Sequence, residues 1–102
     1  MDETLQLGGN IELTGFSEME KGVMIILKKI VGNYARRMSD RADNFEKLSL
    51  HVKKVHAKEK GEIYELHAKM LDNGKPFTST VEDRNLFVAI DNSLKKIVNQ
   101  MN

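Results

Sequence analysis

The basic residues of this chain have the type and spacing that could bind phosphate groups. If residues 19–38 form a helix, Lys21, Lys28, Lys29 and Arg36 lie within a sector of roughly 100°. No acidic residue interrupts the sequence between Lys21 and Arg36. A stripe of one charge sign contacts phosphates and releases counterions. The alternative interpretation is that these side chains only keep a surface helix soluble.

Gly32 lies within this stripe. Glycine in a helix interior costs about 1 kcal/mol relative to alanine. A bare backbone on a basic face would let another backbone approach closely, which favours a binding role for this side of the helix.

A second basic group accompanies the last helix of the chain, which the sequence predicts between Asn85 and Asn102. Arg37 lies at the edge of the first stripe, and two neighbouring helices would present their basic flanks to a shared groove. The candidate RNA-binding residues are therefore Lys21, Lys28, Lys29, Arg36, Arg37, Arg84, Lys95 and Lys96.

Histidines and lysines on the predicted strands form another candidate surface. The alternation of the strands directs His51, Lys53, His67 and Lys69 away from the core, as candidate contacts for a partner. His51 and His67 could approach each other across neighbouring strands. A zinc site needs three or four protein ligands, and neither a thiolate nor a third convergent histidine is evident. We therefore expect no metal and no cofactor.

Catalysis finds little support in the sequence. The chain has no GK[ST] phosphate loop, and nothing singles out a Ser-His-Asp set among its polar residues. Phe77 and Tyr64 occupy inward strand positions, so no surface pair of aromatic rings is available to stack bases. We expect a protein that is not an enzyme, has no small-molecule substrate, and contacts RNA mainly at phosphate and sugar.

Composition sets the remaining limits. The chain has 102 residues, which suits a single domain over residues 1–102. It has no cysteine, no apolar run of the roughly 18 residues that span a membrane, and no signal-peptide pattern, so we expect a cytoplasmic protein with no membrane partner. With 16 basic and 15 acidic side chains, any anion binding must come from how the charges are distributed.

Hydrophobic periodicity predicts the elements that would position these residues. A short strand falls at Ile11–Leu13, followed by a helix that Ser17 and Glu20 could cap, with an apolar stripe that includes Ile26. The helical period is lost between Ser39 and Asn44. Three strands follow, in "LSLHVKKVHA", "EIYELHAKML" and "PFTSTVE", joined by the turns "KEKG" and "DNGK". Asp83 is the predicted N-cap of the last helix.

This order predicts an α+β fold, β-α-β-β-β-α, with one four-stranded mixed sheet. Both helices carry one apolar stripe, so they pack on the same face of the sheet, and the crossover makes the first two strands parallel. The other face of the sheet stays open.

The element order and the last helix resemble the ribosome hibernation promoting factor family, which includes ribosome-associated inhibitors of the protein Y type. "LHVKKV" resembles the family's second strand and "ELTGFSEME" its first strand and helix start. Asn99 stands where the family usually has arginine, and the segment around "SDRADNFEK" is longer than usual. The matching positions in the last helix are Phe87, Ala89, Ile90, Asp91, Lys96, Gln100 and Met101.

The resemblance implies a two-layer sandwich similar to double-stranded-RNA-binding domains. It also implies a non-catalytic protein that binds rRNA of the small ribosomal subunit, for translation inhibition or ribosome storage during stress. The alternative is a protein-interaction module that forms a homodimer through its exposed sheet or an edge strand. Such a dimer could also tether two ribosomal particles.

Overall fold

Five strands and two helices make up the computed structural model, which describes residues 3–57 and 61–101. In chain order they are β1 (Thr4–Gln6), β2 (Ile11–Thr14), α1 (Lys21–Arg41), β3 (Phe45–Ala57), β4 (Gly61–Asp72), β5 (Lys75–Asp83) and α2 (Leu86–Gln100). Residues 58–60 of the predicted turn "KEKG" lie outside the described residues.

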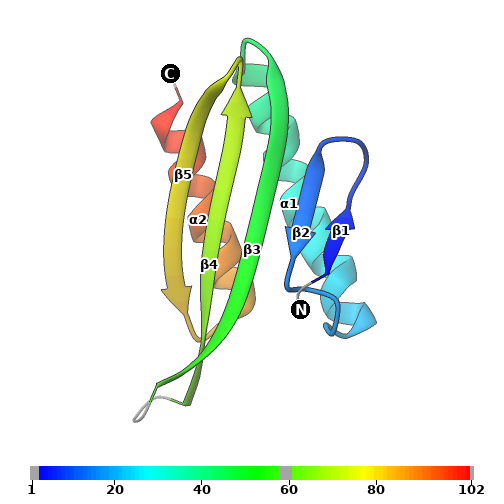
Figure 1. Cartoon of the computed structure of the whole chain (residues 1–102), viewed down its shortest axis with the longest axis vertical. Helices are drawn as coiled ribbons and strands as arrows, with labels where there is room; N and C mark the ends of the chain where they lie inside the picture. The colour runs from blue at the N-terminus through cyan, green and yellow to red at the C-terminus, as the bar shows by residue number, and fades with distance from the viewer. Residues whose placement is uncertain (1–2, 58–60, 102) are drawn as a thin grey trace.

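The strands form one mixed sheet in the order β1-β2-β3-β4-β5. β2 pairs with β3 in parallel, with Leu13 opposite Leu50, and the other neighbours are antiparallel. Both helices lie against the same face of the sheet, α2 behind β4 and β5 and α1 beside it (Figure 1). The predicted α+β class, the parallel first pair and the shared helix layer are confirmed.

The predicted number of four strands is wrong, because β1 adds a fifth. β1 pairs antiparallel with β2, with Leu5 opposite Leu13, and the chain reverses through Gly8 at φ 71°. A strand of three residues is too short to show the alternation that reveals strands in a sequence.

The hairpin between β4 and β5 forms where the Asn-Gly pair predicts it. Asn73 has φ 51° and Gly74 has φ 82°, the positive values that a two-residue turn between twisted strands requires. This turn fixes the register in which Met70 faces Phe77 and His67 faces Thr80.

The start of α1 differs from the prediction. Glu20 is its N-cap and makes no side-chain cap hydrogen bond, so Ser17 does not cap the helix. Ile26 was expected in the apolar stripe but is 50% exposed, because the buried stripe is narrower and centred on Leu27, Val31 and Met38. The helix ends at Arg41, within the predicted interruption between Ser39 and Asn44, and β3 starts directly after it at Phe45.

The N-cap of α2 is Asn85 rather than the predicted Asp83. The Asn85 side chain accepts hydrogen bonds from the backbone N–H groups of Phe87 (2.9 Å) and Val88 (3.2 Å). Asp83 acts one step earlier, since its carboxylate accepts the N–H of Asn85 at 2.8 Å. The two residues form consecutive turns that lead the chain from β5 into the helix.

The core lies between the helix layer and the inner face of the sheet. Its largest fully buried side chains include Phe16, Leu48, Leu66 and Ile90, and Tyr64 and Phe77 pack against it half-buried. Neither helix is long and apolar enough to cross a lipid bilayer over the described residues. The outer face of the sheet is left without a covering layer (Figure 1).

Candidate nucleic-acid interface

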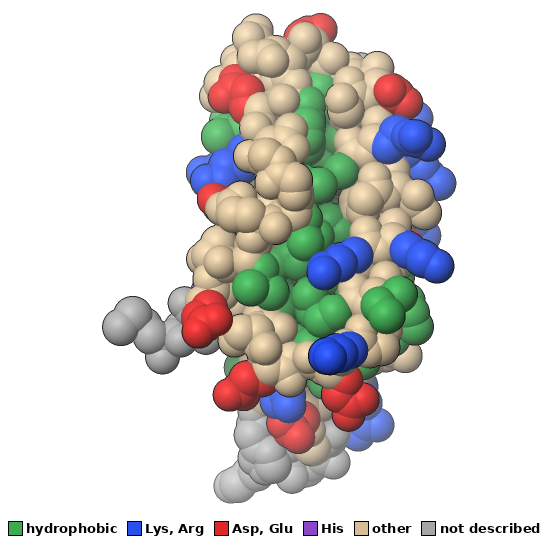
Figure 2. Space-filling model, turned by 90° about the vertical axis from the view of Figure 1, so that its right-hand side faces the viewer, with side chains coloured by type: hydrophobic (Ala, Val, Ile, Leu, Met, Phe, Trp, Pro, Cys, Tyr) green, Lys and Arg blue, Asp and Glu red, His purple; other side chains and the backbone are tan. Residues whose placement is uncertain are grey.

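All eight candidate RNA-binding side chains are exposed. Seven of them stand on α1 and α2, and basic side chains line the α1 side of the molecule in Figure 2. The apolar side chains that hold these helices point into the core, so the cations are displayed by a rigid layer rather than by loops.

The basic side chains of α1 form no ion pair with any described carboxylate. Among the described residues, none of Lys21, Lys28, Lys29 and Arg36 forms an ion pair. By contrast, Lys47 pairs with Glu12 at 2.9 Å on the sheet. Unpaired cations in one row keep their full charge for an outside anion and release their counterions when it binds.

The helix geometry divides the α1 cations between two flanks. Lys21 and Lys28 are seven residues apart and share one flank, because seven residues make nearly two full turns. Arg37 follows Lys28 by nine residues and therefore lies about 180° around the helix. Lys29 and Arg36 lie on the outer surface between the two flanks.

The flank with Arg37 meets α2 at a small polar cluster. The Tyr34 hydroxyl donates to Asp91 Oδ1 at 2.8 Å, and the Arg37 guanidinium lies 5.1 Å from the centre of the Tyr34 ring. Asp91 Oδ2 lies 3.6 Å from Lys95 Nζ, one helical turn along α2. Through Tyr34 and Asp91 the cluster links Arg37 of α1 to Lys95 of α2.

Burial of the Tyr34 phenol, together with its hydrogen bond to the Asp91 carboxylate, raises the pKa of Tyr34 above its usual 10.0. The neighbouring Arg37 opposes this shift only in part. Tyr34 therefore stays a neutral hydrogen-bond donor at physiological pH. The helical spacing of Tyr34 places it with the apolar stripe and does not reveal the partner of its hydroxyl, although a buried tyrosine hydroxyl usually has one.

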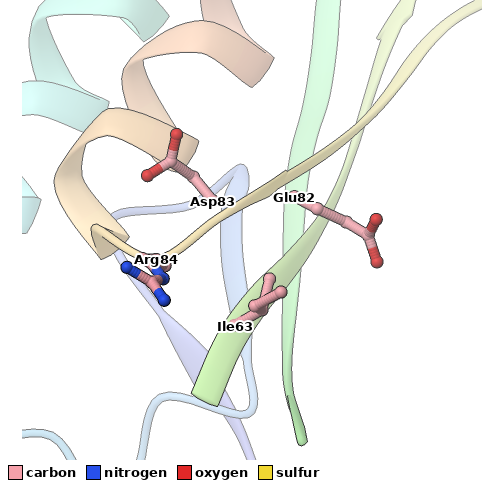
Figure 3. A pocket seen from close by; sticks show the side chains of 4 residues that line it. All are labelled: Ile63, Glu82, Asp83 and Arg84. Carbon is pink, nitrogen blue, oxygen red and sulfur yellow. The ribbon is translucent and has the colours of Figure 1, made fainter. Parts of the chain in front are cut away.

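Lys96 and Arg84 are set apart from this cluster. Lys96 follows Lys95 by one residue and projects about 100° away from it on α2. Arg84 lies between β5 and α2, at a hollow of about 510 Å³ that Ile63, Glu82 and Asp83 also line (Figure 3). Glu82 and Asp83 line the same hollow and give it a mixed charge, so Arg84 is the least suited of the predicted set to bind phosphate.

The four sheet-face candidates occupy the outer surface, where His51 and His67 are directly opposite each other on β3 and β4. Their ring centres are 6.4 Å apart. Nε2 of His67 lies 2.7 Å from the Glu65 carboxylate, which lowers the pKa of Glu65, and Nδ1 lies 3.3 Å from the Thr80 hydroxyl. Both ring nitrogens of His67 are thus engaged, and no metal-ligand cluster occurs in residues 3–57 and 61–101.

Charges on this sheet face are mixed. Lys47 is neutralised by Glu12, Lys53 faces Glu65 across the strands, and Lys69 lies opposite Thr78. A shallow hollow of about 260 Å³ lies over the two histidines, with Lys69 and several hydroxyls at its rim. The helix layer, rather than the sheet, therefore offers the surface of one charge sign.

Comparison with known proteins supports the fold. The N-terminal domain of Protein Y from Thermus thermophilus is similar in structure, with a TM-score of 0.52 and 20% sequence identity over 94% of each chain. No protein-family model matches the sequence, and no curated protein does. The likeness shows that this chain shares the two-layer fold of a Protein Y domain.

Proposed function

We propose that this protein is a non-catalytic ribosome-binding protein that docks on RNA of the small subunit through the exposed basic side chains of α1 and α2. The observation that carries the proposal is the row of unpaired cations on α1: Lys21, Lys28, Lys29 and Arg36. The resemblance to the hibernation factor family and the shared fold with a Protein Y domain favour ribosomal RNA as the RNA that these side chains bind.

The proposed mechanism is occupancy. Two helices on a five-stranded sheet form a rigid wedge that fills space needed by transfer RNA, messenger RNA or initiation factors. Its contacts are to phosphate and sugar, because Tyr34 is buried and Tyr64, Phe77 and Phe87 are half-buried against the core. Binding of this kind stores or inhibits the subunit without changing it chemically.

Co-sedimentation with purified ribosomal subunits over a salt series tests this proposal. The test variant replaces Lys28, Lys29, Arg36 and Arg37 with alanine. The matched control removes the same number of positive charges elsewhere, by replacing Lys53, Lys54, Lys69 and Lys75 with alanine. We expect salt-sensitive binding to the small subunit that the test variant loses and the control retains.

Equal loss in both variants would mean that only net charge matters, and unchanged binding of the test variant would remove α1 from the interface. Either result contradicts the proposal.

Self-association through an edge strand receives less support. On β5, Gln100 Nε2 donates to the Thr78 carbonyl at 2.8 Å, and Pro76 has no N–H to offer. Both features block pairing with another strand. Gel filtration at micromolar concentration tests this alternative, because a dimer would elute at twice the mass of the chain.

A further inference from the structure

A hollowed strip of hydrophobic side chains runs between the β1–β2 hairpin and α1 (Figure 2). α1 packs mainly on α2 and β3, so the inner face of the hairpin is only partly covered. Leu5, Leu7 and Ile11 from the hairpin and Met24 from α1 contact the core but remain half-buried. Basic side chains border the strip on the α1 side (Figure 2).

Lys28 and Lys21 belong to this border. They lie on the flank of α1 opposite Arg37, and Arg37 marks the α2 side through its contact with Tyr34. Met24 shares the flank of Lys28, four residues earlier. The strip thus combines an apolar floor with a cationic rim.

The sheet edge beside the strip is open. Leu7 N–H donates to the Ile11 carbonyl at 2.8 Å, and Glu3 accepts from Gly15, so odd-numbered residues of this segment bond to β2. The alternation of an antiparallel pair then directs the N–H and C=O groups of Thr4 and Gln6 to the free edge. β2 is the only neighbour of β1 within the described residues.

The two edges of the sheet therefore differ. The β5 edge carries Pro76 and a carbonyl covered by Gln100. The β1 edge offers backbone donors and acceptors above an apolar strip. An edge strand beside a helix is the arrangement that accepts an extended peptide as an added strand.

We propose that the β1 edge and the strip beside α1 bind an extended, acidic segment of a partner protein by strand addition. Backbone groups of Thr4 and Gln6 pair with the segment, its alternate apolar side chains enter the strip, and its carboxylates meet Lys21 and Lys28. The proposal shares Lys21 and Lys28 with the proposed RNA interface, and the β1 edge, which that interface does not use, distinguishes the two sites.

A second copy of this chain fits the surface less well. Antiparallel pairing of two β1 strands about a twofold axis would place both α1 helices on the same side of the joined sheet, with their basic rims near each other. Like charges facing across an interface oppose association. With an acidic partner, the charges that face each other across the interface are opposite and attract.

A fluorescent peptide with the sequence Glu-Glu-Val-Thr-Val-Thr-Val-Glu-Glu is the probe for anisotropy titrations with the full chain. A second peptide replaces every glutamate with lysine and keeps the apolar pattern. A third replaces the central valine with proline, which cannot complete a strand ladder. We expect saturable binding of the first peptide only.

Two protein variants locate the site. Thr4→Pro removes an N–H that points to the free edge and keeps the backbone ladder between β1 and β2, although it also loses the 3.0 Å contact between the Thr4 and Thr14 hydroxyls. The affinity for the acidic peptide should fall about tenfold or more, whereas Thr4→Val, which loses only the hydroxyl contact, should bind like the parent. The double change K21E and K28E should weaken it similarly, whereas K53E and K69E, with the same change in net charge, should not. Circular dichroism verifies that each variant is folded.

Ribosome co-sedimentation by Thr4→Pro separates the two proposals, since this variant should retain the parent's ribosome binding. Absence of saturable binding by the acidic peptide overturns strand addition. A second pattern of results would also overturn it: the proline peptide binds as well as the first peptide, Thr4→Pro binds as well as the parent, and a uridine oligonucleotide displaces the peptide. The surface would then recognise only charge.

Discussion

The hydroxyl of Tyr34 on α1 donates a 2.8 Å hydrogen bond to Asp91 on α2, joining the two helices at the point where their basic flanks meet. The Asp91 carboxylate also lies near Lys95, and the guanidinium of Arg37 lies over the Tyr34 ring. One phenol and one carboxylate therefore connect the surroundings of two cations that belong to different helices.

Replacing Tyr34 with phenylalanine removes this hydrogen bond and keeps the packed ring. We expect the free energy of unfolding at neutral pH to fall by about 1 kcal/mol, the usual net value of one hydrogen bond. Urea denaturation measures the change. An unaltered midpoint would show that the bond adds nothing to folding.

The same variant should alter the alkaline pH dependence of stability. The folded protein keeps the Tyr34 phenol protonated to a higher pH than the unfolded chain does, because burial and Asp91 raise its pKa above 10.0. The associated stability is therefore complete below pH 10.0 and is lost as pH rises through the folded-state pKa. In denaturation series between neutral pH and pH 11, the parent should lose more stability than Tyr34→Phe, and parallel curves would contradict this assignment.

Single alanine substitutions of Lys29 and Arg36 test their role as phosphate contacts. Each should weaken ribosome binding and lower the slope of log affinity against log salt by about one, because one fewer counterion is released. Lys69→Ala, on the opposite layer, should leave the slope unchanged. A weaker affinity with the parent's slope would indicate a contact that is not ionic.

Gly32→Ala separates folding from binding on the same helix. An added Cβ would meet no atom within 4 Å, so alanine should stabilise the helix by about 0.5–1 kcal/mol. If another backbone approaches the basic stripe here, the same methyl group should reduce ribosome affinity severalfold. A Gly32→Ala variant that is more stable and keeps the parent's ribosome affinity would show that no backbone approaches the stripe at this position.

The sequence predicted the longer elements well because their periodic patterns extend over many residues. β3, β4 and β5 alternate over nine or more residues each, and the Asn73-Gly74 turn requires a backbone conformation that few other pairs adopt. β1 escaped detection because three residues carry no period. The sequence predicts its partner strand β2, but the pairing of the two strands is recognisable only in the fold, where Leu5 lies opposite Leu13.

The candidate site was predictable in part for a related reason. Helical spacing alone groups Lys21, Lys28, Lys29 and Arg36, and all four are exposed. The Tyr34–Asp91 contact joins residues separated by 57 positions in sequence, and no local pattern links them. Ile26 was predicted to be buried and is exposed, because helical spacing does not reveal how much of the apolar stripe the neighbouring elements cover.

The cap of α2 offers a direct test of a corrected prediction. Asn85→Ala leaves the N–H groups of Phe87 and Val88 without their side-chain acceptor and should cost about 1 kcal/mol of stability. Asp83→Ala removes one hydrogen bond to the exposed loop and should cost less. Thermal denaturation of the two variants compares them, and a larger loss for Asp83→Ala would restore the original assignment.

Gln100 and Pro76 should act together to keep the β5 edge unpaired. The Gln100 amide occupies the Thr78 carbonyl at 2.8 Å, and Pro76 withholds a donor two residues away on the same strand. The double variant Gln100→Ala with Pro76→Val restores a continuous row of free backbone groups, which is the condition for pairing between two chains. Sedimentation velocity should then detect stronger self-association than in the parent, increasing with concentration. Asn99→Ala, an exposed change one residue earlier, is the control, and a double variant with the parent's mass distribution would show that these residues do not protect the edge.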